Sequence, residues 1–302
     1  MSTFVGKVNP VIVKELRGRM RGPRAAAILT LYLSVLSAVT LLVYWFTGAT
    51  VNYSGPGASQ VGKLLFGTLV VFQTALVTLL APAFTSGSIT QEREQKTYDL
   101  LMTTLLPARS VVLGKLGSAL LYVVLLIVAV APLESLAFIF GGVSPEEVVL
   151  SQVVMLMAAL LFASIGIFWS SVMRSSLASN VLTYGTILFQ LVALPMIYWL
   201  VVTVLQASYN RGPVAGPPFS ATPEFYTLSG LVLSSNPLVA MGLSEALLIK
   251  GDPLFIYNST TILNGHSLLV VSPWLIFCLE ALLCSVLLVS LAIRRLGSVR
   301  HR

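Results

Sequence analysis

Six long apolar runs constrain the fold of this chain more than any other feature. Each exceeds the roughly 20 residues that an α-helix needs to cross the hydrocarbon core of a bilayer. Hydrophobic residues make up 56% of the 302 residues and charged residues only 10%, whereas globular domains average about 25% charged residues. A soluble core could not bury this much apolar surface, so we expect an all-α integral membrane protein with six transmembrane helices. The predicted spans are Ala25–Thr47, Leu64–Gly87, Val111–Phe140, Val148–Met173, Leu177–Gln206 and Leu268–Ile293.

The third and fifth predicted spans are long for a bilayer, and each contains a proline, Pro132 and Pro195 respectively. Proline removes a helical hydrogen bond and crowds the preceding turn. We therefore expect these two spans to be tilted or kinked.

The basic residues divide unequally between the two sides of the predicted membrane. Fifteen of the 18 Lys and Arg residues lie in segments 1–24, 88–115 and 294–302 or at Arg174, all on the side of the amino terminus. Cytoplasmic loops carry an excess of Lys and Arg, so we expect both termini and segment 88–115 to be cytoplasmic. The three basic residues on the other side are Lys63, Arg211 and Lys250.

The segment before the first span has the pattern of an interfacial helix. Pro10 suits the first helical position after a capping Asn9. Beyond it, an apolar stripe faces a basic side formed by Lys14, Arg17 and Arg21. A helix of this kind lies along the surface of an anionic leaflet.

Segment 88–115 is a charged island between two apolar runs. Ser88 followed by Gln91 predicts a capping box and a helix that begins there, and Pro107 ends or bends it. At 100° per residue the charged side of this helix faces away from an apolar side. The charged side consists of Glu92, Arg93, Lys96 and Asp99, and the apolar side of Tyr98, Leu101, Met102 and Leu105.

Glu94 breaks this pattern, because the helical wheel places it on the apolar side. A lone buried carboxylate is costly, so we expect a partner for it. Arg17, Arg21 or a donor on a partner protein could fill that role, whereas Glu92 should be solvated.

The connection at 207–267 is the longest on the outer side. It is rich in Gly and Pro near Arg211–Pro223, and Ser235–Asn236–Pro237 then opens a helical stretch that ends near Ile249. This stretch is too short to span a bilayer, so we expect a re-entrant or interfacial helix. The predicted organisation is a single transmembrane domain. Its parts are an interfacial helix (1–24), spans one to five (25–206), the outer loop (207–267), span six (268–293) and a tail (294–302).

No motif for catalysis, metal binding or nucleotide binding stands out. Segment 57–64 approaches a phosphate-binding loop but lacks the final Ser or Thr and follows no predicted strand. His266 and His301 are far apart, and Cys278 and Cys284 share one apolar run. We expect no ATPase, no enzyme activity and no cofactor on this chain.

Two acidic residues fall inside predicted spans. A carboxylate at the centre of a span costs roughly 2.5–3.5 kcal/mol on insertion scales, so Glu280 should face protein or water. It is either a polar point on a translocation path or a packing contact. Glu134 lies near the outer end of the third span, where an interfacial acid is the favoured interpretation.

Three stretches together resemble the permease subunit of ABC exporters of the type-2 class. They are NPVIVKELR near the amino terminus, ITQEREQKTYDLLMTTLLPARSVVLGK between spans two and three, and SSNPLVAM before the last span. The second stretch is the most specific of the three. The chain departs from the family at one point. Where the family often has Thr-Pro-Leu, this chain has Thr104, Leu105, Leu106 and then Pro107. We therefore expect the turn to begin one or two residues later.

The resemblance implies a coupling helix after span two that docks in a groove of a separate ABC ATPase subunit. By resemblance, this element would contain Glu92, Arg93, Glu94, Lys96, Tyr98 and Asp99. The family works as a dimer of permeases with two ATPases, with short re-entrant helices at the outer face. The expected partners are thus the ATPase, which would hold ATP and magnesium, a second permease copy or homologue, and membrane lipids, with no nucleic acid. The expected location is a prokaryotic plasma membrane.

Two other classes stay open on the sequence alone. One is a secondary transporter or channel that uses Glu280 and Glu134 as ion or proton sites; inverted repeats would favour it, but none is apparent. The other is a membrane anchor with no transport role.

Overall fold

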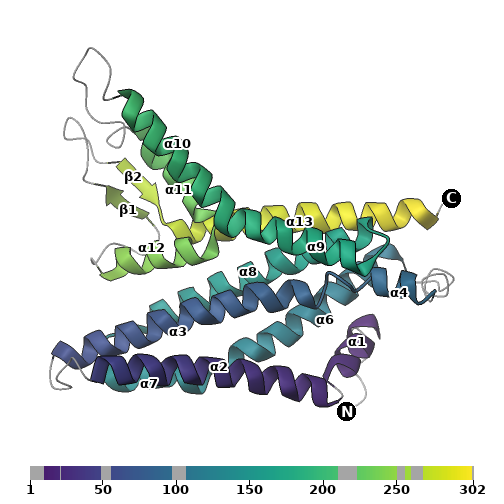
Figure 1. Ribbon diagram of the computed structural model, residues 1–302, viewed down its shortest axis with the longest axis horizontal. Coiled ribbons are helices and arrows are strands. Elements are labelled where there is room, and N and C mark those ends of the chain that lie inside the picture. Colours follow the sequence, from purple (N-terminus) through teal and green to yellow (C-terminus); the bar gives the residue numbers. More distant parts are fainter. Residues whose placement is uncertain are drawn as a thin grey trace. The chain divides into compact units, whose positions relative to one another are not determined.

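The computed structural model describes residues 10–20, 22–48, 56–96, 107–209, 223–249, 256–259 and 268–300. Its elements are helices except for one short hairpin (Figure 1). Within these described ranges, six helical segments are long and apolar enough to cross a membrane, in agreement with the predicted number of spans. The segments are Ala25–Thr47, Ser59–Ala83, Ala108–Phe140, Pro145–Val172, Ser176–Ser208 and Pro273–Gly297.

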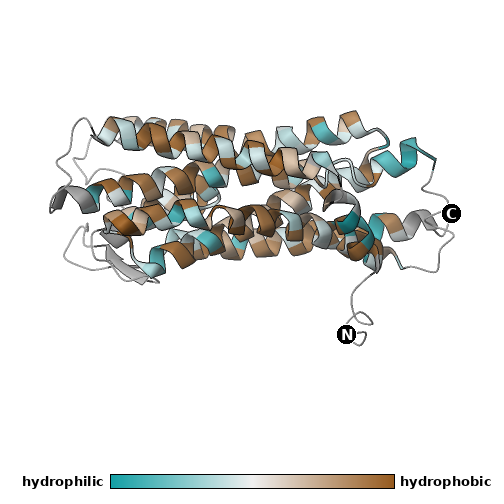
Figure 2. Ribbon diagram, turned by 90° about the horizontal axis from the view of Figure 1, so that it is seen from below, coloured by the Kyte–Doolittle hydropathy of each residue, from teal (hydrophilic) through white to brown (hydrophobic). Residues whose placement is uncertain are grey.

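The helical ribbons are mostly hydrophobic along their lengths, and strongly hydrophilic stretches lie mainly near helix ends (Figure 2). Many large apolar side chains are exposed, among them Leu31, Trp45 and Trp199. Exposed apolar surface on this scale suits a lipid environment and not water. The helices are α1 (Pro10–Met20), α2 (Pro23–Gly48), α3 (Pro56–Ala83), α4 (Thr90–Glu94), α6 (Ala108–Ala129), α7 (Ala131–Phe140), α8 (Pro145–Val172), α9 (Ser176–Leu188), α10 (Leu194–Tyr209), α11 (Pro223–Ser234), α12 (Pro237–Ile249) and α13 (Pro273–Arg300).

The contacts divide the chain into two compact units. Unit 1 consists of Met1–Tyr184 and Cys284–Arg302, and unit 2 of Gly185–Leu283. Helix α9 and the π-helical segment Phe189–Ala193 lie along the chain where the first unit passes into the second.

Both expected irregularities in the long spans are present. The third span is divided at Val130, between α6 and α7, and Pro132 lies at the start of α7. In the fifth span, the π-helical segment Phe189–Ala193 ends two residues before Pro195. A π-bulge accommodates a proline because the ladder of hydrogen bonds is already shifted in the turn that the ring crowds.

The fold is all-α as predicted, apart from two short strands before the sixth span that the sequence did not predict. Strands β1 (Ile256–Ser259) and β2 (Leu268–Val271) form an antiparallel pair, with Ile256 opposite Val271. The sixth span therefore begins at Pro273, not at Leu268. A short apolar run has no periodicity that separates a strand from the start of a helix. The short helix predicted from Ser235–Asn236–Pro237 is confirmed as α12. The resemblance implied more than one short helix here, and α11 is a second one whose bounds were not predicted.

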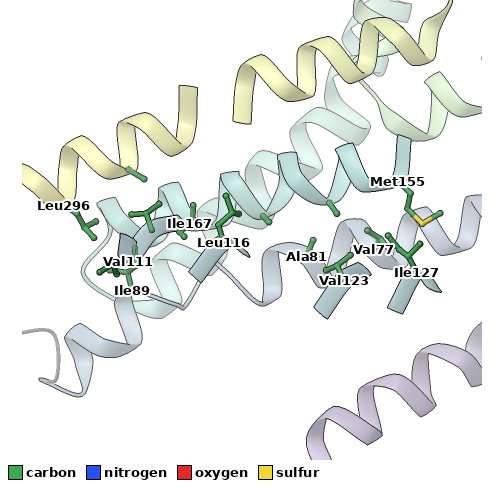
Figure 3. Close-up of a cluster of buried hydrophobic side chains, with 14 residues drawn as sticks. Val77, Ala81, Ile89, Val111, Leu116, Val123, Ile127, Met155, Ile167 and Leu296 are labelled. Atoms are coloured by element: carbon green, nitrogen blue, oxygen red, sulfur yellow. The ribbon is translucent and has the colours of Figure 1, made fainter. Parts of the chain in front are cut away.

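A buried apolar cluster joins α3, α6 and α8 in unit 1 (Figure 3). Ile89, in the turn before α4, packs into the same cluster, as does Leu296 near the end of α13. Figure 3 labels Val77, Ala81, Ile89, Val111, Leu116, Val123, Ile127, Met155, Ile167 and Leu296 from this cluster. The core that holds the spans together therefore also anchors the segment that leads into α4.

Gly166 lets α8 approach the end of α3 closely. A Cβ atom at this position would lie 2.2 Å from Thr85 Oγ1 and 3.2 Å from the Pro82 carbonyl oxygen. A Cβ here would force the buried Thr85 hydroxyl to move and press on backbone atoms of Pro82 and Ser86. Gly166 thus fixes the turn formed by residues 84–89, which positions α4.

We predict that Gly166→Ala destabilises the protein by about 1–3 kcal/mol, the usual cost of overpacking a core. Gly67→Ala is a matched control, because it also lies within a helix but a Cβ there meets nothing within 4 Å. The control should be neutral or stabilise by up to about 1 kcal/mol through helix propensity. Thermal unfolding in detergent measures both, and equal midpoints for the two variants would contradict the close packing at Gly166.

Candidate functional site

Helix α4 is much shorter than the sequence predicted. It begins at Thr90 and ends at Glu94, and Lys96 just beyond it has a left-handed backbone conformation, with φ of 57°. The predicted capping box is not formed, because the Ser88 hydroxyl donates to the Thr85 carbonyl oxygen at 2.8 Å. The rest of the predicted helix, including Tyr98 and Asp99, lies outside the described residues.

The first turn of α4 is held by the end of α8. The backbone N–H groups of Ile89 and Thr90 both point to Ser170 Oγ, at 2.9 and 3.3 Å. The N–H groups at a helix start have no partner within the helix. Ser170, from another span, accepts from them in place of a local N-cap side chain. This contact fixes the start of α4 on α8.

Lys115, on α6, contacts three acceptors in this region with its ammonium group. Its side chain is 3% exposed, and its Nζ donates to Glu92 Oε1 at 2.8 Å, the Ser88 carbonyl oxygen at 2.9 Å and Glu15 Oε1 at 3.2 Å. An ammonium group has three donors, and each has an acceptor here. Glu15 belongs to α1, Ser88 and Glu92 to the α4 region, and Lys115 to α6. One buried cation therefore joins three elements.

Arg93 extends from α4 to the carboxyl end of α8. Its Nη1 donates to the Met173 carbonyl oxygen at 2.7 Å, and its Nη2 donates to that of Ser171 at 3.1 Å. The last carbonyl groups of a helix lack partners within it and carry partial negative charge. A guanidinium group is well suited to this position because its donors form a rigid fork.

Glu94 accepts hydrogen bonds from the first residue of α9, Ser176. It accepts hydrogen bonds from the backbone N–H of Ser176 at 2.7 Å and from the Ser176 hydroxyl at 2.8 Å. These hydrogen bonds, first the backbone one and then the side-chain one, lower the pKa of the Glu94 carboxyl below its ordinary value. A carboxylate near the start of a helix is also stabilised by the helix dipole.

The structure therefore reverses the predicted faces of this helix. Glu92 and Arg93, expected to be solvated, are partly buried against α6 and α8, whereas Glu94 is exposed. Its partner is Ser176, and neither Arg17 nor a residue outside the chain is needed. The helical wheel was wrong because it assumed a long helix with an apolar face toward the membrane domain. A five-residue helix instead contacts that domain mainly through polar side chains at span ends.

The predicted interfacial helix is confirmed as a helix, α1, with Lys14 and Arg17 exposed; Arg21 lies outside the described residues. Helix α1 packs on α6, and Ile12 Cδ1 would lie 3.2 Å from a Cβ at Gly117. Between Glu15, Glu92 and Lys115 a cleft of about 310 Å³ opens beside α4. Figure 1 shows α1 and α4 near the same end of α6.

Glu134 is not the interfacial acid that the sequence favoured. It is 5% exposed, and its two oxygens accept from Gln152 Nε2 of α8 at 2.8 and 3.1 Å. Tyr32 of α2 and Gln73 of α3, both buried, lie nearby. Polar side chains from three other helices, α2, α3 and α8, therefore lie around this carboxyl group inside unit 1.

Glu280 lies in unit 2, where it is partly buried. Its Oε2 accepts a hydrogen bond of 2.5 Å from Ser235 Oγ, beside the start of α12. The neighbouring Asn236 donates to the Leu191 carbonyl oxygen at 2.9 Å in the π-helical segment. Within the described ranges, no group of three or more His, Cys, Asp or Glu side chains is arranged to hold a metal ion.

Six apolar helices and a polar element held at the ends of several of them define a multi-pass membrane protein. A family model described as ABC-2 family transporter protein matches residues 10–290. The chain therefore belongs to the ABC-2 family of transporters and is a permease. In this family the ATPase is on a separate subunit. Comparison with the curated proteins finds no match.

Several residues of this site were missed in the sequence. Lys115 was counted with the cytoplasmic island although it lies inside the predicted third span, and a charge inside a span calls for a partner. That signal could have identified it. Glu15, Ser170 and Ser176 gave no such signal, because their roles depend on which span ends meet.

We predict that Lys115→Met destabilises the protein by about 3 kcal/mol, because it removes a buried cation that Glu92, Glu15 and the Ser88 carbonyl oxygen share. Glu92→Gln in the same chain should recover part of this loss, since it removes one of the two carboxylate charges that Lys115 faces. A double-mutant cycle of thermal unfolding measures this coupling. Additive effects of the two substitutions would show that the ion pair contributes nothing.

Proposed function

We propose that this chain is the permease of an ATP-driven exporter that works as a dimer, with α4 as the element that receives motion from a separate ABC ATPase. The observation that carries the proposal is the attachment of α4. Its inner side is tied to α1, α6, α8 and α9 through polar side chains. Its outer side leaves Gln91, Gln95 and Lys96 exposed.

This arrangement suits the transmission of force. A helix of five residues is not stable in isolation, so its position depends on the groups that hold it. Those groups are charged or hydrogen-bonded. Such contacts are directional, so they resist displacement of α4 more than non-directional apolar contacts would. A push on α4 would therefore move the ends of several spans together.

The side of the membrane follows from the charge distribution. Fifteen of the 18 basic residues flank the spans on the side of α1 and α4, which favours a cytoplasmic position for both. ATP and magnesium would be bound by the partner ATPase on that side. Family membership argues against the secondary-transporter and anchor alternatives.

A site-specific photo-crosslink tests the proposal. The tagged chain, with a benzophenone amino acid in place of Gln95, is expressed in its native host, irradiated and purified in mild detergent. We predict a covalent product with an ABC ATPase, because Gln95 is exposed beside α4. The same probe at Trp45, exposed near the opposite end of α2 from α1, should give none. Copurification without an ATPase, or equal crosslinking at both positions, would refute the coupling role.

A further inference from the structure

Unit 2 contains a groove whose walls are apolar and whose charged group is Glu280. Helix α10 contributes Ile197, Tyr198 and Val201, and α11 contributes Leu231 and Val232. The groove has a volume of about 400 Å³, within the range of pockets that hold small organic molecules.

Glu280 is the group in the groove that can select a ligand by charge, because the other polar side chains that line it are neutral. The Tyr198 hydroxyl is hydrogen-bonded to Ser229, and Ser229 in turn donates to the Phe225 carbonyl oxygen at 2.5 Å. Ser235 uses its hydroxyl on Glu280 Oε2. Among the described lining residues Glu280 is the only carboxylate, and none is basic.

We infer that this groove binds a hydrophobic cation, with its apolar body against α10 and α11 and its charge at Glu280. The inference rests on the proposed function and names the substrate class of the permease. Charge complementarity favours this occupant. A lipid chain or an apolar helix of a second copy would cover the walls but leave the carboxylate without a counter-charge, which is costly away from water. An anionic ligand would be repelled.

A charge series on one molecular shape tests the inference. The purified permease in nanodiscs of zwitterionic lipid is titrated with radiolabelled tetraphenylphosphonium, and with tetraphenylborate as the anion of the same shape. We predict saturable binding of the cation and none of the anion. Glu280→Gln should weaken cation binding at least about tenfold. Glu146→Gln, an exposed acid at the start of α8, should bind the cation like the unsubstituted chain.

A second variant keeps the test independent of folding. Ile197→Trp narrows the groove at a residue that is 51% exposed, so it should fold normally and still lose the cation while Glu280 is intact. The inference is wrong if Glu280→Gln or Ile197→Trp binds the cation normally, if the anion binds equally well, or if neither ion binds. Because the ATPase is absent from this assay, such a result leaves the crosslink at Gln95 as a separate test of the proposed function.

Discussion

The buried ammonium group of Lys115 is the contact on which the region around α4 depends. Away from water an unpaired lysine is strongly unfavourable, so the side chain must have acceptors wherever the spans place it. The chain supplies three, from α1, from α4 and from the turn that precedes α4. Each of these segments is short or amphipathic, so its own apolar packing does little to fix it in this position.

Apolar packing and polar contacts have separate tasks in unit 1. The buried cluster between α3, α6 and α8 accounts for the association of long helices, and Gly166 sets their closest approach. Polar contacts occur mainly where spans end, and there they satisfy backbone groups that a helix leaves without partners. Ser170 serves the start of α4, Arg93 the end of α8 and Glu94 the start of α9. Each of these three helix ends is thus completed by a residue from another helix.

The features that depend only on local hydropathy and on proline positions could be predicted from the sequence. The number of spans, their limits to within a few residues, the irregularities near Pro132 and Pro195 and the existence of α1 and α12 all follow from hydropathy and proline chemistry. The features that depend on which segments meet were mispredicted or missed. The faces of α4 were reversed, the partner of Glu94 was wrong, and β1 and β2 were not foreseen. Glu134 shows the same limit, because its burial is decided by Gln152 on a different span.

We propose that α4 and the spans that hold it move as one body when a partner ATPase acts. Spin labels at Gln95, beside α4, and at Val149, exposed near the far end of α8, report on it directly. About 35 Å of helix lies between Val149 and the end of α8, at 1.5 Å per residue, which is accessible to pulsed electron paramagnetic resonance. The distance distribution should be the same in the nucleotide-free complex and in the complex trapped with ATP. A distribution that shifts between these two states would contradict the claim.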